Sequence, residues 1–168
     1  MLNFQKRLYL ELAELMDQAG LAPNLQFGEF CWWYFAQQEQ GGAVSMAYYD
    51  DETKAAAEAQ LGRPLHVFIS PSDDAAYNGY ADAGFLRERL RAHVAAIANH
   101  VRAAYPPARL EVLFPYDVNH PVAAGVHQLG GPLNRYVNLP TAWENKASSG
   151  VDGLKIEALD FGAWSRDL

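Results

Sequence analysis

The chain has 168 residues, which is enough for one domain with a substantial core. Half of its residues are hydrophobic and 20% are charged, so we expect it to fold rather than remain disordered. The net charge of -7 argues against nucleic acid as a partner, because binding to a phosphate backbone depends on clustered Lys and Arg. No apolar run reaches the roughly 18 residues that cross a membrane, so we expect no membrane partner.

The expected cellular location rests on sequence signals that are missing. The first residues, 1–7, do not show the basic-then-apolar order of a signal peptide, so a cytoplasmic location is the default expectation. The single cysteine, Cys31, allows no disulfide within the chain, and we expect a buried, inert thiol there.

The first part of the chain predicts two helices that flank a strand. Apolar residues at helical spacing predict a first helix that begins at the N-cap Asn3 and is stopped by Gly20. A strand is expected over 25–29. An alanine-rich stretch predicts a second helix that begins near Asp50 or Asp51 and stops at Gly62.

The rest of the chain follows a helix-then-strand order. In chain order we expect a strand or surface loop over 65–69, a long helix over 83–105, strands over 110–115, 136–139 and 154–157, and the start of a helix over 158–168. The long helix is ended by two prolines, and a strand follows after a short link. This order is the α/β pattern.

Three acidic residues come at the ends of apolar, strand-like runs: Glu29, Asp117 and Glu157. Barrels of alternating strands and helices place their reactive groups at the carboxyl ends of strands. Glycoside hydrolysis commonly uses two carboxyl groups, about 5–5.5 Å apart in retaining enzymes and about 6.5–9.5 Å apart in inverting ones. Glu29 lies among aromatic residues, which favours its protonated form, so we interpret it as the acid and Glu157 as the nucleophile or stabilising carboxylate.

Two of these acids also have a structural alternative. Glu157 is placed to complement the dipole of a following helix, and an Asp at a turn such as that of Asp117 often caps its own backbone. The functional interpretation of Asp117 and Asn119 is recognition of neighbouring sugar hydroxyls.

Aromatic residues supply candidate walls for a binding pocket. An extended run that contains Trp32 and Trp33 cannot turn every ring inward, because neighbouring side chains alternate between faces. Tyr49, Arg135 and Tyr136 are further candidates for lining the pocket. The alternatives are that one tryptophan covers an edge of the core and that Arg135 forms a structural salt bridge.

The sequence contains no motif that indicates a metal site, a phosphate-binding loop or a serine nucleophile. His120 and His127 match no zinc pattern, and His93 and His100 lie seven residues apart on the expected long helix. No glycine-rich phosphate loop and no G-x-S-x-G elbow occur in the sequence. We therefore expect neither a metal nor a cofactor.

With these residues in hand, the chain resembles the carboxyl-side part of a barrel-type glycoside hydrolase of the large group that uses two glutamates. The resemblance rests on Gln-Phe-Gly-Glu at 26–29, with the aromatic run behind it, and on Lys-Ile-Glu-Ala at 155–158. It implies Glu29 as acid/base at the end of strand four and Glu157 as nucleophile at the end of strand seven. The sequence departs from the family at Gly28, where that group often has Asn.

These patterns predict an α/β fold: a partial or degenerate (β/α)8-type barrel, the carboxyl-side half, in a single domain over 1–168. A complete barrel typically needs about 250 residues. The expected function is a glycoside hydrolase-like domain that acts on or binds carbohydrate. The alternative is a non-catalytic carbohydrate-binding or assembly domain. Unpaired sheet edges should be covered by loops, by a second copy in a homo-oligomer, or by a missing barrel half.

Overall fold

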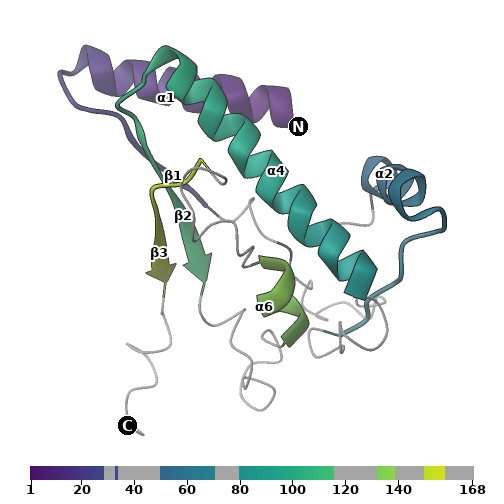
Figure 1. The fold of residues 1–168 in the computed structure, drawn as a ribbon. Coiled ribbons are helices and arrows are strands. Elements are labelled where there is room, and N and C mark those ends of the chain that lie inside the picture. The colour runs from purple at the N-terminus through teal and green to yellow at the C-terminus, as the bar shows by residue number, and fades with distance from the viewer. Residues whose placement is uncertain (29–32, 34–49, 71–79, 116–131, 139–149, 158–168) are drawn as a thin grey trace, which may run out of the picture. The chain divides into compact units, whose positions relative to one another are not determined.

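The computed structural model describes residues 1–28, 33, 50–70, 80–115, 132–138 and 150–157. The chain divides into two compact units, and each is assembled from segments that are far apart in the sequence. The first unit consists of residues 1–31, 89–114 and 140–156, and the second of residues 32–88, 115–139 and 157–168. Figure 1 shows the described elements as ribbons.

The first unit opens on helix α1 (Leu2–Gln18). Its buried residues are Gln5, Tyr9 and Ala13, which recur every four residues and so share one face. The helix ends in a Schellman motif: the N–H of Gly20 donates to the carbonyl of Asp17, and the N–H of Leu21 to that of Met16. Gly20 has a φ of 74°, so the sequence signal for the end of this helix is confirmed.

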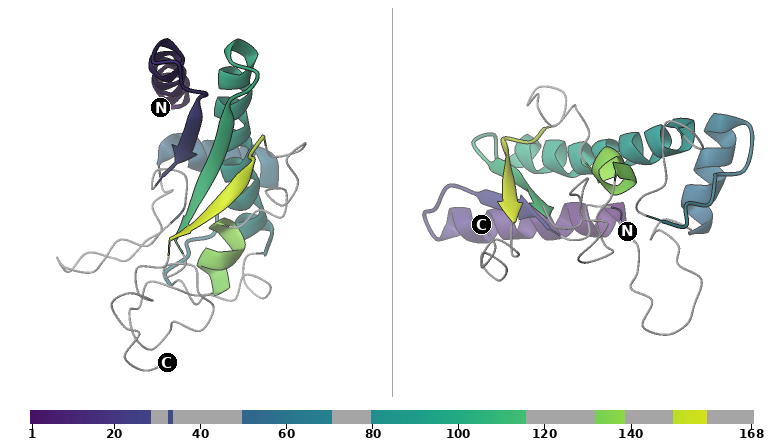
Figure 2. Two further views of the ribbon diagram at one scale, coloured as in Figure 1. Left: turned by 90° about the vertical axis from the view of Figure 1, so that its left-hand side faces the viewer. Right: turned by 90° about the horizontal axis from the view of Figure 1, so that it is seen from below.

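Three strands form the sheet: β1 (Asn24–Phe27), β2 (Arg109–Pro115) and β3 (Gly153–Glu157). They are parallel, and β2 lies between the other two, as Figure 2 shows. In the register of β1 and β2, Leu25 lies beside Leu110 and Phe27 beside Val112. All four side chains are buried, whereas the residues that alternate with them along β1 are exposed. The sheet therefore buries one face here.

Helix α4 (Tyr80–Ala104) is the longest described element. Its residues 89–104 belong to the first unit, where the buried positions Leu90, Val94, Ile97 and Val101 follow helical spacing. Helix α1 packs on β1 through the rings of Tyr9 and Phe27, whose centroids lie 4.8 Å apart.

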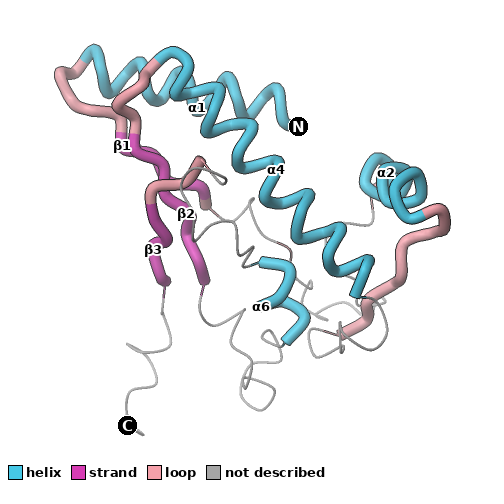
Figure 3. Tube along the Cα trace, viewed as in Figure 1, coloured by secondary structure: helices cyan, strands magenta, loops and turns pink. Residues whose placement is uncertain are grey.

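The described part of the second unit consists mainly of helices and of the loop that follows α2, which Figure 3 colours cyan and pink. It contains α2 (Asp51–Leu61), the first turns of α4 and α6 (Pro132–Asn138). Helix α2 starts at the N-cap Asp50, whose carboxylate accepts from the N–H of Thr53 at 2.8 Å, and ends at Gly62 with a φ of 71°. The core of this unit is formed by Ala57, Leu65, Phe68, Ala83, Phe85, Leu86, Leu133 and Val137.

Several expected elements are confirmed. Helix α2 matches the expected second helix, β2 and β3 match two of the expected strands within one residue at each end, and α4 begins three residues before the expected start at residue 83. Residues 64–70 form an extended loop in which Leu65 and Phe68 are buried. The expected N-cap is wrong, because α1 starts at Leu2 and Asn3 lies within its first turn. The expected helix over 158–168 falls outside the described residues.

The predicted half-barrel is wrong. The described residues contain three parallel strands in an open sheet and four helices, which is too little sheet for half of a (β/α)8 barrel. Barrel strands are buried on both faces, whereas β1 exposes Asn24 and Gln26. The apolar runs that predicted a barrel are strands of a sheet with one buried face.

The expected strand over 136–139 is also wrong, because most of this run belongs to helix α6. Pro132 occupies the first residue of α6, where its fixed φ favours a helix and its missing N–H costs nothing. Leu133 and Val137, four residues apart, are both fully buried. A helical period, not an alternating one, therefore fits this segment.

Candidate functional site

The carboxyl ends of the three strands define the candidate site. Since the strands are parallel, their carboxyl ends meet at one edge of the sheet, toward which the arrowheads point in Figure 1. Glu157 is the last residue of β3. In the sequence, Glu29 comes two residues after β1 ends at Phe27, and Asp117 comes two residues after β2 ends at Pro115.

Most of the predicted site residues fall outside the part of the chain that the structure describes. These are Glu29, Trp32, Tyr49, Asp117 and Asn119. For Glu157 and Arg135 the structure gives the backbone, in β3 and α6 respectively. Their assignment to a site stays a prediction.

Trp33 is described, and its polar groups are bonded within the second unit. Its indole Nε1 donates to the carbonyl oxygen of Leu86 at 2.9 Å. The side chain of Asn138 bonds the backbone of Trp33 in both directions: Oδ1 accepts from the Trp33 N–H, and Nδ2 donates to the Trp33 carbonyl, both at 2.5 Å. The ring packs against the core of the second unit. Trp33 therefore packs against a core, which agrees with the alternative in which one tryptophan covers a core edge.

Tyr136 packs against the same core and meets the first turns of α4. The guanidinium carbon of Arg87 lies 4.7 Å from the centroid of its ring, a cation–π contact. A Cβ added at Gly84 would lie 3.8 Å from the Tyr136 hydroxyl, so the end of this side chain reaches the first turns of α4. The structure thus brings Trp33 and Tyr136 to one cluster of the second unit.

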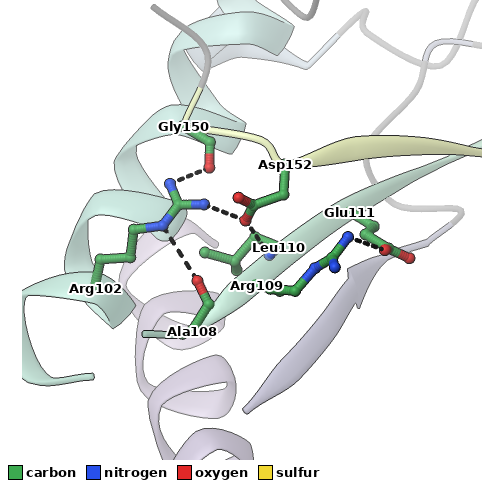
Figure 4. A network of polar contacts seen from close by, with 7 residues as sticks. All are labelled: Arg102, Ala108, Arg109, Leu110, Glu111, Gly150 and Asp152. Carbon is green, nitrogen blue, oxygen red and sulfur yellow. Dashed lines mark hydrogen bonds and ion pairs between the residues drawn. The ribbon is translucent and has the colours of Figure 1, made fainter. Parts of the chain in front are cut away.

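A polar network in the first unit was not anticipated from the sequence. Figure 4 shows Arg102, in the last turn of α4, reaching the segment before β3. Its Nη2 lies 2.5 Å from Asp152 Oδ2, its Nη1 donates to the carbonyl of Gly150, and its Nε donates to that of Ala108 at 3.3 Å. The guanidinium therefore joins the end of α4 to the chain before β2 and before β3.

Asp152 completes this network by pairing with the backbone of Leu110. Its Oδ2 accepts from the Leu110 N–H at 2.8 Å, and its own N–H donates to the Leu110 carbonyl at 2.7 Å. The Asp152 side chain is only 8% exposed and that of Arg102 20%, so the ion pair is shielded from water. It fastens the amino ends of β2 and β3, away from the carboxyl ends of these strands.

A pocket of about 420 Å³ adjoins this network; it is lined by Asn99, Arg102, Pro106, Pro107, Ala108, Arg109, Gly150 and Asp152. Both of its shielded charges, Arg102 and Asp152, are already bonded to each other and to backbone groups. Exposed Arg109 contacts Glu111 at 3.4 Å. The polar groups of this pocket therefore serve the fold.

The second unit has an arginine–aspartate pair of its own. Asp82, in the first turn of α4, accepts two bonds from Arg63, at 2.9 Å and 2.5 Å, and a third from the backbone N–H of His66 at 2.6 Å. Burial alone would raise the pKa of Asp82, but the bonds from Arg63 and His66 outweigh it and hold the pKa below its usual value. The charged carboxylate thus anchors the loop after α2.

Sequence reasoning missed Arg102, Asp152, Arg63, Asp82 and Asn138. Only Asp82 had a local signal, since acidic residues favour the first turn of a helix. The partners of the others lie far away in the chain; Arg102 and Asp152, for example, are 50 residues apart.

No group of three or more His, Cys, Asp or Glu side chains is placed to hold a metal ion in the described ranges. Among the described helices, none combines the length and the apolar character that a membrane span requires.

Comparison of the chain with models of protein families, with curated proteins and with solved structures gives no match. The resemblance to two-glutamate glycoside hydrolases therefore stays a prediction from short motifs.

Proposed function

We propose that the carboxyl edge of the sheet is a carbohydrate site in which Glu29 and Glu157 act as the two carboxyl groups of glycoside hydrolysis. The observation that carries the proposal is the parallel order β1-β2-β3, which directs all three strand ends to one edge. In open α/β sheets, ligands bind outside the carboxyl ends of the strands. An open parallel sheet meets this condition without closing into a barrel.

The strand order also supports the pairing of these two acids. Adjacent strands lie about 4.8 Å apart, so β1 and β3, with β2 between them, are separated by about 10 Å at the backbone. That separation leaves room for a scissile bond between one carboxyl group from each outer strand. Asp117, which follows the central strand in the sequence, is then suited to binding sugar hydroxyls between them.

The two carboxyl groups have different tasks. Glu29, flanked by aromatic residues in the sequence, protonates the leaving oxygen because an apolar setting favours the neutral acid. Glu157 stays ionised and either attacks the sugar or activates a water molecule. Proton NMR of the first-formed anomer distinguishes these two routes, since attack by Glu157 retains the configuration and attack by water inverts it.

The test is turnover of soluble polysaccharides and aryl glycosides of both anomeric configurations by the full chain. Glu29→Gln and Glu157→Gln should each lower kcat by about 10²–10⁴-fold, the usual effect of losing a catalytic acid or base. The matched control is Glu58→Gln, an exposed glutamate on α2, which should leave turnover unchanged. Full activity in both site variants, or no binding and no turnover by the unmodified chain, would contradict the proposal.

The same experiment separates hydrolysis from simple binding. Binding without turnover, left intact by Glu29→Gln, would replace the hydrolase by a carbohydrate-binding module. Intrinsic tryptophan fluorescence measures that binding directly, because the sequence places four tryptophans in this chain.

A further inference from the structure

One face of α1 exposes large apolar side chains along its whole length. Their exposed fractions are 57% for Phe4, 37% for Leu8, 40% for Leu12 and 62% for Leu15. Spacings of three and four residues place these four side chains on one stripe of the helix. We call them the α1 stripe. A contiguous apolar surface of this kind on a folded unit marks an interaction site.

The stripe is held in a fixed orientation because the neighbouring face of α1 is anchored. The Tyr9 hydroxyl donates to the carbonyl of Gln26 at 2.9 Å, and the His93 ring nitrogen Nε2 lies 2.5 Å from Gln5 Oε1. Gln5 and Tyr9 are both buried. The helix therefore cannot rotate about its axis to bury the stripe without breaking these contacts.

The charges of α1 are ordered along its axis. Its basic residues, Lys6 and Arg7, lie in the first half, and its acidic residues, Glu11, Glu14 and Asp17, lie in the second half. At 100° per residue, Arg7, Glu11 and Glu14 border the same side of the stripe. All three are exposed.

We propose that the α1 stripe is the interface of a homodimer in which two copies of α1 pack antiparallel about a two-fold axis. With the axis near the middle of the helix, Phe4 meets Leu15 of the second copy, and Leu8 meets Leu12 of the second copy. The same arrangement sets Arg7 opposite Glu11 and Glu14 of the second copy, twice by symmetry. The surface is thus complementary to itself, as a two-fold interface requires.

The charge order selects this arrangement over a parallel one. In a parallel two-fold pair the charged borders of the two copies would lie on opposite flanks of the interface, so Arg7 would not meet Glu11 or Glu14 of the second copy. A single pair of short helices buries less area than a standard interface of about 1,600 Å², so we expect a weak dimer. The inference does not depend on the proposed hydrolase function.

Sedimentation equilibrium of the full chain over a range of concentrations tests the interface. The unmodified chain should pass from monomer to dimer as its concentration rises. Leu15→Lys should weaken the dimer at least about tenfold, because it sets a charge against an apolar side chain. The matched control is Val67→Lys, since Val67 is also exposed, at 54%, but lies in the second unit. Circular dichroism verifies that both variants fold.

Charge exchange tests the pairing itself. Arg7→Glu gives an all-acidic border, and the double variant Glu11→Arg/Glu14→Arg an all-basic one, so each alone should dimerise at least about tenfold more weakly. An equimolar mixture should form a heterodimer tighter than the unmodified homodimer, and the gain should fade at high salt. Orientation is read from disulfides mapped by mass spectrometry: Phe4→Cys should crosslink to Leu15→Cys, and not to a second Phe4→Cys.

A chain that stays monomeric at all concentrations would overturn the proposal. Equal weakening by Val67→Lys, or charge variants that fail to recover dimerisation when mixed, would also overturn it. Crosslinking between two Phe4→Cys chains would contradict the antiparallel arrangement.

Discussion

The two units are each fastened by an arginine–aspartate pair, but the pairs hold different structures. In the first unit, Asp152 and Arg102 are exposed by only 8% and 20%, and they tie a helix end to the starts of two strands. In the second unit, Asp82 is fully buried while Arg63 is 50% exposed, and the pair holds a loop against the start of α4.

This contrast predicts unequal consequences when the carboxylate is lost. Arg102 would remain shielded without a counter-charge, which is costly. Arg63 would turn its guanidinium into water, so only the bonds to Asp82 would be lost. The stability lost when such a pair is broken therefore depends mainly on whether the arginine can reach water once the aspartate is removed.

The largest effect is expected for Asp152→Ala. It leaves the shielded Arg102 without its partner and the Leu110 N–H without its acceptor, so the free energy of unfolding should fall by about 3 kcal/mol or more. Hydrogen exchange followed by mass spectrometry should show faster exchange in β2 and β3. Unchanged exchange there would show that the network does not hold the strands. Arg102→Met should be costly as well, because it leaves the Asp152 carboxylate, only 8% exposed, without its counter-charge.

Asp82→Ala should cost less than Asp152→Ala, about 2 kcal/mol, because Arg63 regains water. Faster exchange should appear in residues 62–70 and the first turn of α4.

The dependence of stability on pH that Asp82 contributes has a defined sign. The folded-state pKa of Asp82 lies below its usual value of 3.8, so its contribution to stability is complete above that pH and is lost as the pH falls through the folded-state pKa. Chemical unfolding of the unmodified chain at neutral and acidic pH measures this dependence. Equal losses of unfolding free energy in Asp82→Ala and Asp152→Ala would contradict the expected difference between the two pairs.

Two glycines with similar left-handed φ angles extend the comparison between the two units. Gly150, in the first unit, has a φ of 69°, and Gly62, in the second, has 71°. A Cβ on Gly150 would lie 3.1 Å from Ala98 Cβ, whereas one on Gly62 would meet nothing within 4 Å. We expect Gly62→Ala to cost about 1 kcal/mol for its left-handed backbone, and Gly150→Ala about 2 kcal/mol. Thermal unfolding of both variants measures the difference, and equal costs would show that the space beside Gly150 opens freely.

The smallest effect is expected for His93. Burial and the charge of Arg89 lower its pKa from 6.5, so the folded first unit binds fewer protons than the unfolded chain. The stability gained is complete above pH 6.5 and declines as the pH falls below that value, toward the folded-state pKa. Unfolding by urea across this range should show the decline, and His93→Gln should flatten it. A stability that rises on acidification would contradict this assignment.

Elements with signals at both ends were predicted well from the sequence. Helix α2 lies between the N-cap Asp50 and the left-handed Gly62, and these two residues fix its limits independently of packing. The 136–139 run gave a wrong prediction because Tyr and Val favour strands, whereas the preceding Pro132 and the burial of Leu133 and Val137 favour a helix. Short apolar runs do not settle this choice alone.

The barrel was predicted because three apolar runs end near acidic residues. The length of such a run does not show whether a strand buries one of its faces or both. The exposed Asn24 and Gln26 on β1 carry that information. Apart from Asp82 in the first turn of α4, the residues of the polar networks had no local signal, since their partners meet only in the folded chain. The assignment of the three acids to one site stays a prediction from the sequence and from the direction of the strands.

The reciprocal bonds between Trp33 and Asn138 have a consequence for biosynthesis. The two residues are 105 positions apart, a length that a ribosome makes in about 5–20 s. Until Asn138 emerges, the Trp33 backbone lacks this partner, and Leu133 and Val137 are missing from the core that this tryptophan covers. The second unit therefore completes its folding late in synthesis. A truncation before residue 132 would leave its apolar residues exposed, and aggregation of such nascent chains is the expected result.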